Sequence, residues 1–156
     1  MHRNTERVRD ALRALGHDAD VVEFAESTRT SAEAARAIGT SVAQIVKSMV
    51  FTDGSGGVVV LTSGANRVSE TKVAEIVGRS VTRADAHRVR ELTGYPIGGV
   101  PPVGHSTQSE ILIDEDLMGF EEVWAAAGTP NAVFRTTPRD LVRITGAAVA
   151  DVKEPS

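Results

Sequence analysis

The chain of 156 residues contains no cysteine and no apolar run that approaches the length of a membrane-spanning helix. The absence of cysteine excludes disulfide bonds, thiolate metal sites and cysteine nucleophiles. A membrane-spanning helix needs about 18 or more consecutive apolar residues, so we expect no membrane segment. Residues 1–6 begin a charged helical pattern without the apolar core of a signal peptide. We therefore expect a cytoplasmic protein that does not bind a membrane.

Several motifs that carry chemistry are also missing from the sequence. There is no phosphate-binding loop of the Walker type and no nucleophile elbow. No second histidine stands at metal-ligand spacing from His105, because His2, His17 and His87 lie in terminal or helical contexts. We therefore expect neither a metal site nor a cofactor, and no serine or threonine is marked as an activated nucleophile.

The composition is that of an ordinary globular protein, with 41% hydrophobic and 24% charged residues. A chain of this length fits one domain with a real core, which we place at residues 1–156. The net charge is −4, but basic residues outnumber acidic ones between Arg67 and Arg90. A basic face would suit a phosphate-bearing partner. The same charges also fit solvated helix faces.

Hydrophobic periodicity and turn residues predict alternating helices and strands along the whole chain. One helix start is marked by Thr30 and Glu33, which form a capping box, and Gly39 follows its end. Residues 122–127 fit a strand or a helix. We expect helices over 4–15, 31–38, 69–77, 85–92 and 138–144, and strands over 21–24, 45–51, 58–62, 80–82, 110–114, 132–135 and 147–152. This irregular order favours a single α+β domain with a mixed, strongly curved sheet over a doubly wound fold.

The loop over residues 95–105 is unusual, because three glycines and three prolines precede His105 within eleven residues. Proline fixes φ and removes an amide donor, while glycine opens backbone conformations closed to other residues. Such a loop is suited to backbone groups that approach a ligand closely. The alternative is an ordinary connection, for which eleven residues would be long.

Lys47 interrupts a strand that is otherwise made of apolar or small residues. A buried ammonium is costly unless it meets an anion or reaches water, so Lys47 is a candidate cation for a phosphate or a developing oxyanion. The alternative is a lysine that extends from an edge strand into solvent. Ser48 would point to the opposite face of a regular strand.

The ordered set of these motifs resembles the YbaK/EbsC family. This family comprises free-standing relatives of the editing domain inserted in bacterial prolyl-tRNA synthetases. The similarity extends from about Thr30 to Leu141, and it rests on four pieces in the family's order: Gln44-Ile45-Val46-Lys47-Ser48, Leu61-Thr62, the loop from Gly98 to Gly104, and Ala126-Ala127-Gly128.

The resemblance implies a barrel-like sheet surrounded by helices, and hydrolysis of the ester between a wrong amino acid and the 3′-terminal adenosine of tRNA. Lys47 matches the family lysine that holds the terminal nucleotide by its phosphate. Residues 98–102 match the family's G-x-x-x-P loop, which shapes the aminoacyl pocket and positions the carbonyl. The catalytic residues implied are Lys47, Gly98, Gly99 and Pro102, with water or a group of the substrate as the nucleophile.

Further residues are candidates for substrate binding beside this set. The turn at residues 128–131 could border the same pocket or be a plain hairpin turn. His105 could be a base, a hydrogen-bond donor or a loop anchor. The candidates for substrate binding are Ser48, Val100, Pro101, His105, Gly128, Thr129 and Asn131.

The sequence departs from the family in places that bear on the substrate. The cysteinyl-tRNA-specific branch differs after the loop, where this chain has His105, and it tends to carry serine at the position of Ala126; Ser48 replaces a common threonine. Alanine, serine, threonine and cysteine therefore stay open as the amino acid removed. The expected partner is the acceptor end of tRNA-Pro or a related tRNA, with a synthetase as a second source of specificity.

Two other functions are compatible with the sequence. The first is a non-catalytic module that binds a tRNA end or a nucleotide and associates with a synthetase. The second is an unrelated small-ester hydrolase, for which no nucleophile is apparent. The presence of both Lys47 and the glycine-proline loop favours catalysis over a decayed copy of the editing domain.

Overall fold

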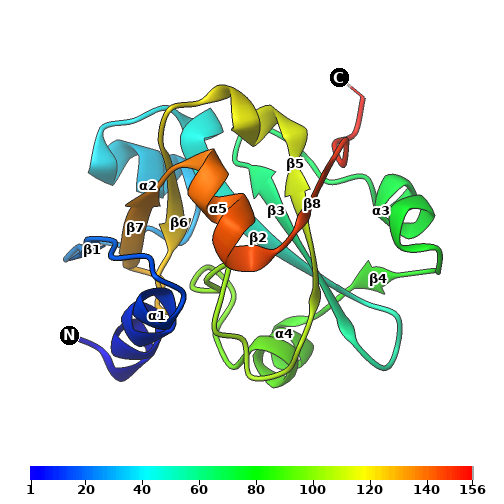
Figure 1. The fold of residues 1–156 in the computed structure, drawn as a ribbon, viewed down its shortest axis with the longest axis horizontal. Coiled ribbons are helices and arrows are strands. Elements are labelled where there is room, and N and C mark those ends of the chain that lie inside the picture. Colours follow the sequence, from blue (N-terminus) through cyan, green and yellow to red (C-terminus); the bar gives the residue numbers. More distant parts are fainter. Residues whose placement is uncertain (156) are drawn as a thin grey trace.

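The computed structural model describes residues 1–155 and gathers its strands into one eight-stranded sheet (Figure 1). The helices are α1 (Arg3–Ala14), α2 (Ser31–Ile38), α3 (Glu70–Val77), α4 (Ala86–Thr93) and α5 (Pro138–Thr145), with short 3-10 segments η1 (Val42–Gln44) and η2 (Glu115–Gly119). The strands are β1 (Val21–Glu23), β2 (Ile45–Thr52), β3 (Gly57–Ser63), β4 (Thr82–Arg83), β5 (Glu110–Asp114), β6 (Val123–Ala126), β7 (Ala132–Thr136) and β8 (Ala148–Ala150).

The strand order is β1-β7-β6-β2-β3-β5-β8, and β4 pairs with the free part of β2. β2 is parallel to β6, β3 to β5 and β5 to β8, while the other pairs are antiparallel. The sheet is therefore mixed, and it is curled without closing. The predicted α+β class is confirmed, and the barrel-like sheet is an open one.

The helix boundaries follow the capping residues of the sequence. Glu33 N donates to Thr30 Oγ1 at 3.1 Å and Thr30 N donates to Glu33 Oε1 at 3.2 Å, which completes the predicted capping box of α2. Gly39 ends this helix with φ of +84°, a conformation that favours glycine. Thr137 caps α5, since its Oγ1 accepts a hydrogen bond from Asp140 N at 3.1 Å, and Pro138 holds the first helical position.

Two expected segments differ in extent or type. Residues 122–127 contain the strand β6, because Val123 and Ala125 point into the core while Trp124 and Ala126 face the opposite side. The strand expected over 80–82 is only the two-residue β4, displaced by about one residue. Within residues 1–155, no helix combines the length and apolar character needed to cross a membrane.

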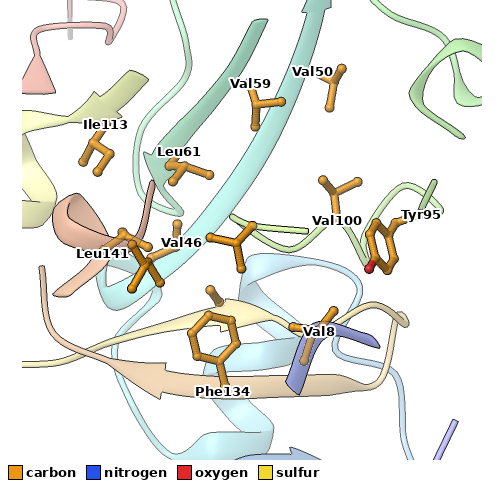
Figure 2. Packing of buried hydrophobic residues seen from close by; sticks show 14 of the residues in the cluster. Val8, Val46, Val50, Val59, Leu61, Tyr95, Val100, Ile113, Phe134 and Leu141 are labelled. Carbon is orange, nitrogen blue, oxygen red and sulfur yellow. The ribbon is translucent and has the colours of Figure 1, made fainter. Parts of the chain in front are cut away.

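The β2–β3 hairpin forms the centre of the sheet, and β3 is buried along its whole length. Its side chains alternate between two faces, so Val59 and Leu61 join one apolar cluster while Val58 and Val60 join another. The first cluster lies under α1, α4 and α5, and Figure 2 shows Val8 of α1 and Leu141 of α5 facing this hairpin. The second cluster lies under α3.

The loop after α4 also belongs to the core. Tyr95 and Val100 are both buried and point towards Val8 and Val46 (Figure 2). The glycine-proline loop is thus fixed to the body of the protein by its apolar side chains, and its backbone runs past the middle of β2.

Candidate functional site

One edge of β2 is unpaired in its middle. On that edge, β6 pairs only with Ile45 and Val46, and β4 pairs only with Phe51 and Thr52. Residues 47–50 lie between these two short partners, although β2 is central in the sheet. The strand is thus central in the order of the sheet but has an open edge at Lys47 and its neighbours.

The backbone of Ser48 faces this gap. Val50 O points to the same edge, where it accepts a hydrogen bond from Ala84 N at 3.0 Å. Because peptide groups alternate between the two edges of a strand, Ser48 directs its N–H and C=O to that edge too. No strand within residues 1–155 pairs with Ser48 there. Its amide and carbonyl are available to an extended ligand.

A cavity of about 390 Å³, here called the β2 cavity, lies at this gap. Its floor is made of small apolar side chains from β2, β6, β7 and α2, and its rim is polar. The residues that line it are Thr28, Arg29, Thr30, Ser31, Ala34, Ile45, Val46, Lys47, Ser48, Met49, Gly64, Arg83, Ile97, Gly98, Val100, Trp124, Ala125, Ala126 and Val133.

All the charged residues that line the β2 cavity are positive: Arg29, Lys47 and Arg83. A larger cavity of about 780 Å³ lies elsewhere, near α5 and β7, and carboxylates predominate in it, among them Asp18 and Glu121. Like charges repel, so an anionic ligand would avoid the larger cavity and enter the β2 cavity.

Lys47 is half-buried, and Nζ donates to the backbone carbonyl of Asn66 at 3.2 Å. Burial lowers the pKa of Lys47, and the positive charges of Arg83 and Arg67 lower it further. No carboxylate within residues 1–155 lies within 4.0 Å of Nζ. An anion bound beside Lys47 would offset both effects.

Asn66 is held in place by two carboxylates. Its side-chain amide donates to Asp114 Oδ2 and to Asp116 Oδ2, each at 2.9 Å. Asp114 is fully buried and also accepts from Thr62 Oγ1 at 2.9 Å and from Ser63 N at 3.0 Å. This network fixes the turn after β3, and with it the carbonyl that Lys47 contacts.

The glycine-proline loop is tied to β2 by one side chain. Ser48 Oγ donates to Val100 O at 2.9 Å, which confirms that Ser48 and Lys47 point to opposite faces of the strand. Gly98 has φ of +84°, and a Cβ at this position would collide with Cγ of Arg29. Only glycine therefore fits between the loop and Arg29 without strain.

The turn at residues 128–131 supports the loop from behind. Gly128 N donates to Gly99 O at 2.9 Å, and a Cβ on Gly99 would lie 2.9 Å from backbone atoms of Thr129. Asn131 Nδ2 donates to Phe24 O at 2.9 Å, which joins the turn to the segment that carries Arg29. This turn holds two walls of the cavity together without lining it.

His105 anchors the other end of the loop. Its Nε2 lies 2.6 Å from Pro101 O, so Nε2 carries the proton and donates. Burial lowers the pKa of His105, and the hydrogen bond to Pro101 opposes this in part. Pro102 and His105 line a separate cavity of about 400 Å³ on the far side of the loop.

The structure thus divides the residues expected from the sequence. Four of them line the β2 cavity together: Lys47, Ser48, Gly98 and Val100. The others lie outside this cavity, either elsewhere in the loop or in the turn behind it: Gly99, Pro101, Pro102, His105, Gly128, Thr129 and Asn131. Within the described part of the chain, no group of three or more histidine or acidic side chains is placed to hold a metal ion.

Sequence reasoning missed two of the three positive charges in the cavity. Arg29 directly precedes the capping box at Thr30. Its position before a helix does not predict that it contacts Gly98. Arg83 was one of several basic residues between positions 67 and 90. Its place beside Lys47 depends on the pairing of β4 with β2, which charge counting does not reveal.

Comparison with known proteins shows to which family this chain belongs. The model of the aminoacyl-tRNA editing domain family matches residues 25–144. The uncharacterized protein YwhH of Bacillus subtilis is 31% identical over 135 residues, which are 86% of each chain. The proline–tRNA ligase of Bacillus licheniformis is 29% identical over 146 residues, which cover 89% of this chain but only 26% of the ligase.

Solved structures agree with the sequence relatives. The crystal structure of a proposed trans-editing enzyme for prolyl-tRNA synthetase is 50% identical, with a TM-score of 0.94 over 99% of both chains. The hypothetical protein APE2540 is 38% identical, with a TM-score of 0.89 over 95% of this chain and 99% of that one. The resemblance seen in the sequence is confirmed, and the chain belongs to the aminoacyl-tRNA editing domain family.

Proposed function

We propose that this protein hydrolyses the ester between a wrongly attached small amino acid and the 3′-terminal adenosine of tRNA-Pro or a related tRNA, acting in trans. The observation that carries the proposal is the β2 cavity. Its charged residues are all positive, Lys47 has no carboxylate partner, and an open backbone edge lies beside the glycine-proline loop. This combination suits an ester attached to a phosphate-bearing chain.

The substrate would lie across the gap in β2. The amino acid side chain would occupy the apolar floor near Ala34 and Ala126, and the terminal nucleotide would extend towards Lys47. The ester carbonyl would then come close to the backbone of Ser48 and Gly98. An N–H group aimed at a developing oxyanion typically contributes about 10²-fold or more to the rate.

The reaction requires no covalent intermediate with the protein. A water oxygen forms a bond to the carbonyl carbon, the bond from that carbon to the ribose oxygen breaks, and the proton of the water passes to the ribose oxygen. The cavity lining offers no carboxylate or imidazole to carry this proton. We assign this proton transfer to the neighbouring ribose hydroxyl of the substrate, while the protein contributes orientation and positive charge.

The size of the cavity suits a small amino acid. Ala34, Ala126 and Val133 shape the floor, and Trp124 borders it. Alanine, serine, threonine and cysteine fit such a floor. One methylene in an apolar pocket changes the rate about 10- to 200-fold, so discrimination within this group would be graded.

The same lack of a general base favours a second candidate, a non-catalytic module that binds a tRNA end or a nucleotide together with a synthetase. Lys47 and the open edge would serve binding alone in that case. Both candidates predict tRNA binding, but only the first predicts release of the amino acid.

A panel of tRNAs charged with cysteine, alanine, serine, threonine or proline tests the proposal. Each is incubated with the protein, and free amino acid is measured against spontaneous hydrolysis. Release of one or two small amino acids is expected, faster from mischarged tRNA-Pro than from other tRNAs. If tRNA binds but none of the five is released, the binding module is the correct function.

A further inference from the structure

A second cavity adjoins the β2 cavity along the same strand. It measures about 420 Å³, and Lys47, Met49 and Arg83 line both cavities. Arg67 lines only the second, which is here called the Arg67 cavity. A ligand that leaves the β2 cavity past Lys47 therefore enters the Arg67 cavity.

Three cations line this cavity, Lys47, Arg67 and Arg83, and none of them forms an ion pair within residues 1–155. Arg67 and Arg83 are exposed, and neither guanidinium makes a hydrogen bond or ion pair within residues 1–155. Three other basic side chains of the same stretch are paired: Lys72 with Asp151, Arg79 with Asp53 and Arg88 with Glu91. Clustered like charges repel one another, so an anion bound between them would relieve this repulsion.

The position of Arg67 is fixed by the backbone. Its carbonyl accepts a hydrogen bond from Glu154 N at 2.7 Å, and the next residue, Val68, pairs with Lys153. Glu70 and Glu154 also line the cavity, but neither forms an ion pair with Arg67. The C-terminal segment thus presents Arg67 to the cavity with its charge free.

We propose that the Arg67 cavity binds the phosphodiesters of the last nucleotides of the tRNA 3′ strand, with Arg67 and Arg83 as phosphate ligands beside Lys47. This inference rests on the proposed function. The β2 cavity takes the aminoacyl group, so the polynucleotide must continue through the neighbouring cavity. Guanidinium groups match phosphate geometry, and Met49 and Val68 provide apolar surface for a base or ribose.

The test compares two substrates that differ in phosphate content. One is mischarged tRNA, and the other is the aminoacyl ester of adenosine, which has no phosphate. For Arg67→Ala we expect kcat/KM to fall about tenfold more with tRNA than with the adenosine ester, since one charged hydrogen bond is lost only with tRNA. Arg67→Lys should recover part of the loss.

Binding of uncharged tRNA gives an independent readout. Arg67→Ala should weaken binding and reduce the slope of log affinity against log salt by about 0.7, the value for one single-strand phosphate contact. Arg139→Ala removes an exposed arginine of α5 that lines neither cavity, and it serves as the matched control.

The outcomes separate this inference from the proposed function. If the wild-type protein hydrolyses the ester but Arg67→Ala and Arg83→Ala bind tRNA like Arg139→Ala, the Arg67 cavity is not the phosphate site. Equal losses on both substrates would also overturn it. If no ester is hydrolysed and Arg67→Ala still weakens tRNA binding with the smaller salt slope, the cavity inference stands and the proposed hydrolysis fails.

Discussion

At the scale of single residues, the site depends on how Lys47 is held. Its ammonium meets the carbonyl of Asn66, whose side chain bridges Asp114 and Asp116. The sequence predicted Lys47, because a lysine in an apolar strand is conspicuous. It did not predict Asn66, because the three partners come from segments that are distant in the chain and meet only through the pairing of β3 with β5.

Asn66→Ala should impair catalysis through Lys47. The change removes one donor from Asp114 and one from Asp116 and frees the turn, so we expect kcat/KM to fall about tenfold and stability to fall by about 1–3 kcal/mol. A weaker hydrogen bond to the ammonium lowers the pKa of Lys47 further. The alkaline limb of the pH–rate profile, corrected for spontaneous hydrolysis, should therefore move to lower pH.

Lys153→Ala is the control for this prediction. It removes the partly exposed cation that contacts Asp116 Oδ2 at 2.7 Å and leaves Asn66 in place. Its pH–rate profile should match that of the wild type. An unshifted profile in Asn66→Ala would show that Asn66 has only a structural role.

His105→Gln should change the pH dependence of stability. In the wild type the pKa of His105 is lowered by burial, so the unfolded state takes up a proton first as the pH falls through about 6.5. The contribution of His105 to stability is thus present above this pH and lost below it. Glutamine can still donate to Pro101 O, so the variant should lose less stability than the wild type between pH 7.5 and 5.5.

Urea unfolding at these two pH values measures the effect. His87→Gln is the matched control, because His87 is exposed on α4, and it should keep the wild-type dependence. Identical pH dependence in His105→Gln and His87→Gln would contradict the assignment.

At the scale of elements, the glycine-proline loop combines a buried anchor with a bare backbone. Tyr95 and Val100 pack into the core (Figure 2). Gly98 lies against the side chain of Arg29. Composition alone predicted a loop with close backbone approaches. Which residues line the cavity could not be predicted, because Pro101 and Pro102 face away from it while Val100 contributes to both the core and the cavity wall.

Gly98→Val should block the site. Valine at φ of +84° is strained by about 1–3 kcal/mol, and its side chain would displace Arg29 into the cavity. We expect deacylation to fall at least about 100-fold in the folded protein. The measurement is the deacylation rate normalised to the folded fraction.

Gly146→Val separates strain from blockage. Gly146 follows α5 with φ of +65° and has no heavy atom within 4 Å of the position of its missing Cβ. This variant should lose comparable stability and keep its activity per folded molecule. Unchanged turnover in Gly98→Val would remove the loop from the site.

At the scale of the whole molecule, local patterns predicted most of the architecture. Caps such as Thr30 and stops such as Gly39 marked helix boundaries, and the α+β class followed from the order of the elements. The gap in β2 could not be predicted, because it arises where two short partners, β6 and β4, fail to meet on one edge. The candidate site, the β2 cavity, lies at this tertiary feature.

The distribution of charge over the protein is also a property of the whole molecule. The chain has a net charge of −4, yet Arg29, Lys47, Arg67 and Arg83 border two adjoining cavities. Such a local positive field attracts a polyanion even to an acidic protein. The overall charge does not reveal this local field, and the uneven distribution of charge along the sequence fitted solvated helix faces as well as a phosphate-bearing partner.

The most direct test of the account is the rate of ester hydrolysis on mischarged tRNA by the wild type and by Lys47→Ala. Lys47 is half-buried and its pKa is lowered, so its removal should leave the unfolding midpoint unchanged or slightly raised. Lys72→Ala, which removes a partly exposed lysine paired with Asp151, is the control. The account predicts that Lys47→Ala loses at least about 100-fold in rate while Lys72→Ala matches the wild type. Wild-type hydrolysis by folded Lys47→Ala would contradict the account.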